Sequence, residues 1–209
     1  MNRMKKVLLV LCLLALTAAT AFGTLAYFTD SKEVTNTFTV GKVGLELDEA
    51  KVNEQGEPQG TDRWKPTEGN ESQTYHLLPG HSYTKDPTVT VTAGSERCYV
   101  RILLTIADCE DMADNVLGWL DIDDDWGKPK KLSDGTYEFR YKEAVEKSDD
   151  PTKLDALFKT LTVPGDSVGS AELEKLDDMK ITAIAHAVQA ATFDDADAAW
   201  AAFETQTKK

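Results

Sequence analysis

A glycine-rich pentapeptide at residues 165–169 (Gly-Asp-Ser-Val-Gly) has the pattern of a nucleophile elbow, with Ser167 as the nucleophile. That chemistry requires a serine raised on a strained strand-to-helix turn, followed along the chain by an acid and then a histidine. Asp177, Asp178 and His186 follow in that order. However, His186 lies inside an apolar run that predicts a strand, and no βαβ repeat precedes the motif. We therefore interpret the pentapeptide as a glycine-rich loop.

Three aspartates at alternate positions, Asp121, Asp123 and Asp125, resemble the first half of a calcium-binding loop. The sixth position of such a loop is a glycine that allows a sharp turn, and the twelfth is a glutamate that binds the ion through both oxygens. Here these positions hold Trp126 and Leu132. The sequence thus excludes an EF-hand and predicts a solvated acidic edge, with weak extracellular calcium binding as the alternative.

The histidines form no pattern of a metal site. His76 and His81 do not have the HExxH spacing of zinc peptidases, and no glutamate is placed to activate water. The sequence also contains no Cys/His cluster for zinc, no phosphate-binding loop and no dinucleotide fingerprint. We therefore expect no catalytic, cofactor-binding or metal-binding residues, and we do not expect an enzyme.

The acidic composition restricts the partners of the chain. The 209 residues carry a formal charge of −13, and removal of residues 1–26, which hold three basic residues and no acidic ones, would change it to −16. A chain of this charge repels nucleic acid and anionic lipid, so neither is an expected partner. The remaining length of about 180 residues is enough for one domain with a hydrophobic core.

Residues 1–26 have the three parts of a secretory signal peptide: a basic start, an apolar stretch at residues 7–16 and a small-residue end. Thr24 and Ala26 provide the small side chains that a signal peptidase admits, which predicts cleavage between Ala26 and Tyr27. The alternative is an uncleaved membrane anchor, because residues 7–29 are uncharged and about 20 apolar residues span a bilayer. Polar residues in the second half of this stretch favour cleavage. We expect a secreted protein that meets the membrane only during export.

Alternating apolar residues predict two adjacent strands in the middle of the chain. Val89 and Val91 alternate with threonines, and a turn at residues 93–96 separates them from a ten-residue run at 98–107. Five residues of this run share one face: Cys98, Val100, Ile102, Leu104 and Ile106. We predict that the two strands pair as an antiparallel hairpin and that this face lies in the core.

Four further segments have the pattern of strands. Residues 37–47 change parity at Gly41, and residues 157–163 end at a Pro-Gly turn. Residues 137–141 alternate aromatic and charged side chains, which predicts one face in water, and a Ser-Asp-Gly turn connects them to residues 126–132. Residues 181–191 are apolar on both faces, as in a central, covered strand.

The remaining segments predict short helices and one long loop. Helical turns are expected at residues 108–117 and 170–176, and a C-terminal helix at about 194–204 with Asp194 as its N-cap. Residues 48–73 are polar and contain several glycines and prolines, which predicts a long exposed loop. Short strands, short turns and little helix favour an all-β fold, a β-sandwich that forms a single domain at residues 27–209.

Two cysteines, Cys98 and Cys109, remain after removal of the signal peptide. They lie at the two ends of one predicted strand, and eleven extended residues span roughly 36 Å. Bridged Cα atoms lie only about 5.5–6 Å apart. We expect free thiols, with a disulfide as the alternative if the run folds back on itself.

Several segments are similar to the TasA/camelysin family of exported Gram-positive proteins. The most specific likeness is in residues 23–30 and 36–41, and it continues at 78–80, at 185–191 and at Ala199-Trp200. The resemblance implies a jelly-roll sandwich, processing by a SipW-type signal peptidase and, for TasA-like members, fibres of the extracellular biofilm matrix. Other members occupy cell or spore surfaces, and camelysin is described as a metalloendopeptidase.

The resemblance further implies that fibres grow by donor-strand exchange, in which an N-terminal strand completes the sheet of a neighbouring subunit. Residues 27–40 are the candidate donor strand, with Phe28, Phe38 and Val40 as its apolar side chains. A strand of this kind carries unpaired backbone groups, and the edge of a sheet on the next copy can pair with them in a contact that propagates.

Three functions follow from these patterns. The leading hypothesis is a secreted structural subunit of extracellular matrix or cell-surface fibres, which associates with itself and with other matrix proteins. The second is a monomeric adhesion or binding module that uses the polar segment at residues 48–73 and the acidic edge. The third is a camelysin-type metallopeptidase, which the missing metal-ligand spacing disfavours.

Overall fold

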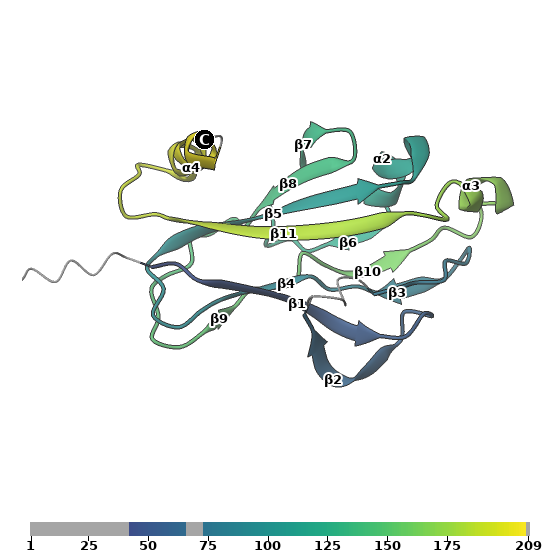
Figure 1. Ribbon diagram of the computed structural model, residues 1–209, viewed down its shortest axis with the longest axis horizontal. Helices are drawn as coiled ribbons and strands as arrows, with labels where there is room; N and C mark the ends of the chain where they lie inside the picture. Colours follow the sequence, from purple (N-terminus) through teal and green to yellow (C-terminus); the bar gives the residue numbers. More distant parts are fainter. Residues whose placement is uncertain (1–41, 66–72, 208–209) are drawn as a thin grey trace, which may run out of the picture. The chain divides into compact units, whose positions relative to one another are not determined.

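The computed structural model describes residues 42–65 and 73–207. The expected signal peptide, its cleavage site at Ala26 and Tyr27, and the candidate donor-strand residues Phe28, Phe38 and Val40 lie outside this part of the chain. The described residues are mostly β, with short helices, as expected (Figure 1). The strands are β1 (Leu45–Val52), β2 (Pro58–Trp64), β3 (Ser82–Thr84), β4 (Thr88–Val91), β5 (Cys98–Ala107), β6 (Leu120–Ile122), β7 (Lys130–Ser133), β8 (Thr136–Arg140), β9 (Thr152–Lys153), β10 (Phe158–Thr162) and β11 (Lys180–Gln189). The helices are the 3-10 turn η1 (Glu110–Met112), α2 (Ala113–Leu117), α3 (Ser170–Glu174) and α4 (Ala196–Thr207).

Within the described residues the strands form three antiparallel sheets. One has the order β2-β1-β4-β9, the second β3-β10-β6 and the third β11-β5-β8-β7. The first and third sheets lie on opposite sides of the view in Figure 1, with β1 and β4 below β11 and β5. Buried side chains from all three sheets join in one hydrophobic core.

Strand β5 lies at the centre of this core and has the bounds that the sequence predicts. Cys98, Val100, Ile102 and Leu104 are fully buried and Ile106 is 2% exposed, which confirms the predicted inward face. The turn that connects β7 with β8 is also as predicted. Gly135 has a φ of +69°, which glycine adopts without strain, and a Cβ there would lie 2.2 Å from the Ile106 carbonyl oxygen.

The expected hairpin of β4 and β5 is wrong. Strand β4 pairs with β1 and β9, whereas β5 pairs with β11 and β8. The turn at residues 93–96 therefore carries the chain from one sheet to another. Alternating apolar residues establish that each segment is a strand with one buried face, but they do not identify the neighbouring strand.

The long loop expected at residues 48–73 is wrong in its first part. The first strand, expected to end at residue 47, continues to Val52, and β2 pairs with its second half. In the connecting turn, Asn53 Oδ1 accepts hydrogen bonds from the backbone N–H groups of Gln55 and Glu57. Arg63 Nε donates to Asp48 Oδ1 at 2.8 Å, so polar side chains stabilise a hairpin that has few apolar ones.

Two expectations about exposure are also wrong. The run at residues 181–191 was expected to be a central strand, yet β11 is an edge strand whose partner among the described residues is β5. The charged face of β8 was expected to lie in water, yet Glu138 is only 2% exposed. Helix α4 covers part of the outer face of this sheet, which accounts for the burial of Glu138 and for apolar side chains on the outer face of an edge strand.

Candidate functional site

The outer edge of β11 is the longest open strand edge in the described part of the chain. All ten residues of β11 pair with β5, from Lys180 opposite Ala107 to Gln189 opposite Cys98. No described strand pairs with its other side. Along an edge strand, half of the backbone N–H and C=O groups point away from the sheet and can pair with another strand. We call this side of residues 180–189 the β11 edge.

Small apolar side chains line the inner face of this edge. Ala183, Ala185 and Ala187 pack against the core and are only partly buried. Across the core, Leu45 and Leu47 in the first half of β1 are also only partly buried. That half of β1 pairs with β4, whereas the pairing of β1 with β2 begins only at Glu49. An apolar strand that paired with β11 would add cover to this side of the core.

Helix α4 packs over the outer face of β11 and β5. Asp195 Oδ1 accepts a hydrogen bond from Ala198 N at 2.8 Å, so the helix is capped by Asp195 rather than by the expected Asp194. Ala199 is fully buried and Trp200 is 1% exposed. The centroid of the Phe203 ring lies 5.1 Å from that of the His186 ring on β11.

A buried arginine joins α4 to the sheet. Arg101 of β5 is 4% exposed, and its guanidinium carbon lies 4.4 Å from the centre of the Trp200 ring and 5.2 Å from that of Phe203. Its Nη1 donates to Glu138 Oε1 at 2.8 Å and to Glu204 Oε1 at 3.1 Å. The side chain thus combines ion pairs with stacking, for which the planar guanidinium is suited.

Burial and charge act against each other in this cluster. Burial by itself would raise the pKa of Glu138, but the hydrogen bond from Arg101 and the ion pair with Arg140 outweigh it and hold the pKa below its ordinary value. The pKa of Arg140 is raised because Glu138 and Asp197 stabilise its charge by more than burial opposes it. The pKa of His186 is lowered by burial and by the nearby charge of Arg101.

This cluster was not predicted from the sequence, although a signal for it is present. A single arginine occurs within the apolar strand 98–107, and a glutamate lies at the middle of the strand 136–140. Leu103 pairs with Glu138, so Arg101 and Glu138 are diagonal neighbours on one face of the sheet. Opposite charges in this position attract each other. Without the strand partners, however, the sequence does not reveal that these two residues meet.

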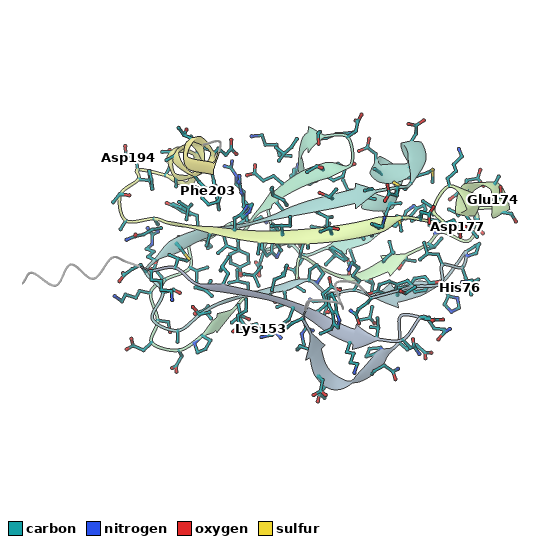
Figure 2. The ribbon with its side chains drawn as sticks, in the orientation of Figure 1. His76, Lys153, Glu174, Asp177, Asp194 and Phe203 are labelled. Atoms are coloured by element: carbon teal, nitrogen blue, oxygen red, sulfur yellow. The ribbon has the colours of Figure 1, made fainter. Side chains whose placement is uncertain are left out.

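The structure does not bring together the residues of the elbow-like pentapeptide. Ser167 is exposed in a loop before α3. Asp177 precedes the start of β11, whereas His186 is its seventh residue, roughly 20 Å further along an extended strand. Figure 2 accordingly shows Asp177 and Phe203, the neighbour of His186, near opposite ends of β11. These residues do not form a catalytic triad in this arrangement.

Of the three aspartates at alternate positions, Asp121 and Asp125 are exposed, as predicted, whereas Asp123 is bound within the protein. Asp123 Oδ1 accepts a hydrogen bond from Asp125 N at 3.0 Å, and its Oδ2 lies 3.3 Å from Lys159 Nζ. Backbone and lysine donors hold the pKa of Asp123 below its ordinary value. No group of three or more metal-ligating side chains is present among residues 42–65 and 73–207.

The other candidate residues lie apart from the β11 edge. His76 and His81 are exposed, and the ring of His81 lies against Tyr83. Cys98 and Cys109 are buried and unbridged, as expected. Burial raises the pKa of the Cys98 thiol to about 11, so it is not a reactive nucleophile at neutral pH.

None of the helices in the described ranges is long and apolar enough to cross a bilayer. Comparison of the chain with protein-family models, with curated proteins and with solved structures gives no match.

Proposed function

We propose that this chain is a secreted structural subunit of extracellular matrix or cell-surface fibres. In this proposal, residues 27–40 of one copy pair with the β11 edge of the next copy, and a SipW-type signal peptidase first removes residues 1–26. The observation that carries the proposal is the ten-residue β11 edge, which is long, apolar and open in the described part of the chain. The export signal and the family resemblance read from the sequence support it.

The composition of β11 favours pairing with another strand. Natural proteins protect edge strands with prolines, bulges or charges. β11 has the sequence KITAIAHAVQ, with no proline or glycine and its one lysine at the first position. Ile184 on its outer face is 50% exposed. An edge of this kind favours self-association in a soluble protein unless it is covered.

The length and exit point of the N-terminal segment fit the proposed pairing. Residues 27–40 span roughly 46 Å when extended, compared with about 33 Å for the ten residues of β11. The chain enters the described domain at Lys42, whose carbonyl accepts a hydrogen bond from Glu96 N at 3.2 Å. Two residues after Glu96, Cys98 pairs with Gln189 at the end of β11. A segment that enters here and pairs with a second copy makes a heterologous contact that can propagate.

The proposed fold is a jelly-roll sandwich of two layers, with β11-β5-β8-β7 facing β2-β1-β4-β9. The shared core of these sheets supports this assignment. We also propose that the chain is not an enzyme. Stoichiometric zinc in the purified protein, measured by elemental analysis, together with peptide hydrolysis would contradict this part of the proposal.

The test separates the donor segment from the subunit that accepts it. A chain that begins at Gly41 should remain monomeric, and a synthetic peptide of residues 27–40 should bind to it and slow hydrogen exchange along β11. A peptide with the same composition in scrambled order is the control. Electron microscopy of the chain that begins at Tyr27 should show fibres. Monomers in the micrographs, or peptide binding that leaves exchange in β11 unchanged, would contradict the proposal.

A monomeric binding module is the second candidate, because the β1–β2 hairpin has an open hollow at its surface. Trp64 and polar side chains line it, including Lys51, Gln55 and Thr74. An aromatic ring among polar groups is a common arrangement in ligand sites. Secreted protein that stays monomeric at high concentration would favour this candidate over the fibre subunit.

A further inference from the structure

Helix α4 is held on the sheet by a small set of charged and aromatic groups. Trp200 and Phe203 contact Arg101, and the Nε1 atom of Trp200 is buried without a hydrogen-bond partner in the described part of the chain. A buried donor without an acceptor weakens the packing of the helix. Ion pairs of Arg101 with Glu204 and of Arg140 with Asp197 add to the contact.

Charged and titratable side chains from five elements surround the contact between α4 and the sheet. They are Arg101 on β5, Glu138 and Arg140 on β8, Lys130 on β7, His186 on β11, and Asp197 and Glu204 on α4. Three cationic side chains and three carboxylates balance one another at neutral pH when His186 is uncharged. Protonation of His186 would add a fourth cation beside the buried pair Arg101 and Glu138.

The contact with Arg101 favours a neutral His186 in the site that α4 covers. Arg101 Nε donates to His186 Nδ1 at 3.4 Å, and an arginine cannot accept a hydrogen bond. Nδ1 therefore acts as the acceptor in this arrangement. If it were protonated, two N–H donors and two positive charges would face each other in a half-buried site.

We propose that α4 is an acid-released cover of the edge strand β11, detached when His186 takes up a proton. Release would expose the outer face of β11 around His186 and leave that part of the strand held by β5. The detachment itself does not depend on fibre formation. Only its consequence for assembly, a change in how readily β11 accepts a donor strand, rests on the proposed function.

The direction of the pH effect follows from the position of His186 between Arg101 and the Phe203 ring of α4. Burial, to which Phe203 of α4 contributes, and the charge of Arg101 lower the pKa of His186 below the value of about 6.5 that the free side chain has. Release of α4 would remove part of this burial. Docking is therefore strongest above about pH 6.5 and weakens as the pH falls towards the lowered value. For one proton, the docking equilibrium changes by at most about tenfold per pH unit.

Hydrogen exchange of the chain that begins at Tyr27 tests the proposal. After correction for the intrinsic exchange rate, the amides of residues 196–207 should open up to about tenfold more often at pH 5.5 than at pH 7.5. Amides of the central strand β5 should not change. Equal protection of α4 at the two pH values would overturn the proposal. The measurement reports on α4 whether or not the chain forms fibres.

Histidine variants test whether His186 is the group responsible for the pH dependence of α4. The chain has three histidines, so the double variant His76→Gln/His81→Gln leaves His186 alone and should keep the pH dependence. His186→Gln should remove it. If His186→Gln does not fold, an NMR titration of the double variant gives the pKa of His186 directly. A value at or above about 6.5 would overturn the proposal.

Discussion

The edge strands β2 and β11 differ in the residues that line their open edges. β2 has the sequence PQGTDRW, with Pro58 at its start and Gly60 at a φ of +80° in its middle. The side chain of Arg63 forms ion pairs with Asp48 and Asp86. β11 is longer and apolar, and it has none of these features. Both strands are at the edge of a described sheet, but only β2 is protected against pairing with another strand.

This difference indicates which edge is suited to an intermolecular contact. A proline and a glycine with positive φ interrupt the ladder that another strand would need, and charged side chains disfavour apolar neighbours. At an edge that pairs with no other strand, these residues reduce the stability of the fold only a little. Their absence from β11, in a chain that protects β2, supports our proposal that β11 pairs with another copy. The following experiments test this comparison.

The largest expected effect is loss of assembly after Ala183→Lys in β11. Ala183 is partly buried beside the core, and a lysine there can reach water in the monomer but not under an added strand. Fibre yield measured by sedimentation should fall to background while the monomer stays folded. Thr61→Lys at the exposed β2 edge is the matched control and should assemble normally. Equal yields for both variants would remove the distinction between the two edges.

Phe38→Asp tests the donor strand in the same way. A charge without a partner would be buried in the neighbouring subunit, which costs more than a lost apolar contact. The variant should therefore fold as a monomer and fail to elongate. If residues 27–40 instead pair within their own subunit, the melting temperature of the monomer should fall at every protein concentration. A stable, fully fibrous variant would contradict both arrangements.

Truncation of β5 tests the strand that supports the β11 edge. Leu104→Ala removes a fully buried side chain and should reduce the free energy of unfolding by roughly 2–5 kcal/mol, as should Ile102→Ala. Chemical denaturation of the monomer measures this change. Leu132→Ala, in the exposed strand β7, is the control and should cost much less. An unchanged denaturation midpoint for Leu104→Ala would place this face outside the core.

The smallest effect is expected from Arg63→Ala on the β2 side. Arg63 Nη2 donates to Thr88 Oγ1 at 2.9 Å and to the Asp86 carbonyl at 3.1 Å, in addition to its two ion pairs. Since the side chain is partly exposed, its loss should cost about 1 kcal/mol. Fibre yield should be unchanged, because the β2 edge is not the proposed contact. A loss of fibres at unchanged stability would assign assembly to β2 instead.

The sequence alone determined the elements whose formation depends on local periodicity. Alternating apolar residues placed β5 at residues 98–107, and they identified the face with Ile102 and Leu104 that is buried. Ser-Asp-Gly before β8 predicted the turn, because glycine accepts the backbone conformation that the turn requires. The separation of Cys98 and Cys109 along one strand predicted that they stay unbridged.

Only the tertiary structure decided which segments lie next to one another. Residues 181–189 are apolar on both faces because β1 and α4 lie across those faces. A central strand with both faces covered would have the same pattern, so periodicity could not distinguish a central strand from an edge strand. Glu138 follows the same alternation as a solvent-exposed residue, and its burial depends on Arg101 from another strand and on α4 from the end of the chain. Such contacts join residues far apart in sequence, and no local pattern encodes them. The β11 edge and the charge cluster beneath α4 could therefore be identified only from the tertiary structure.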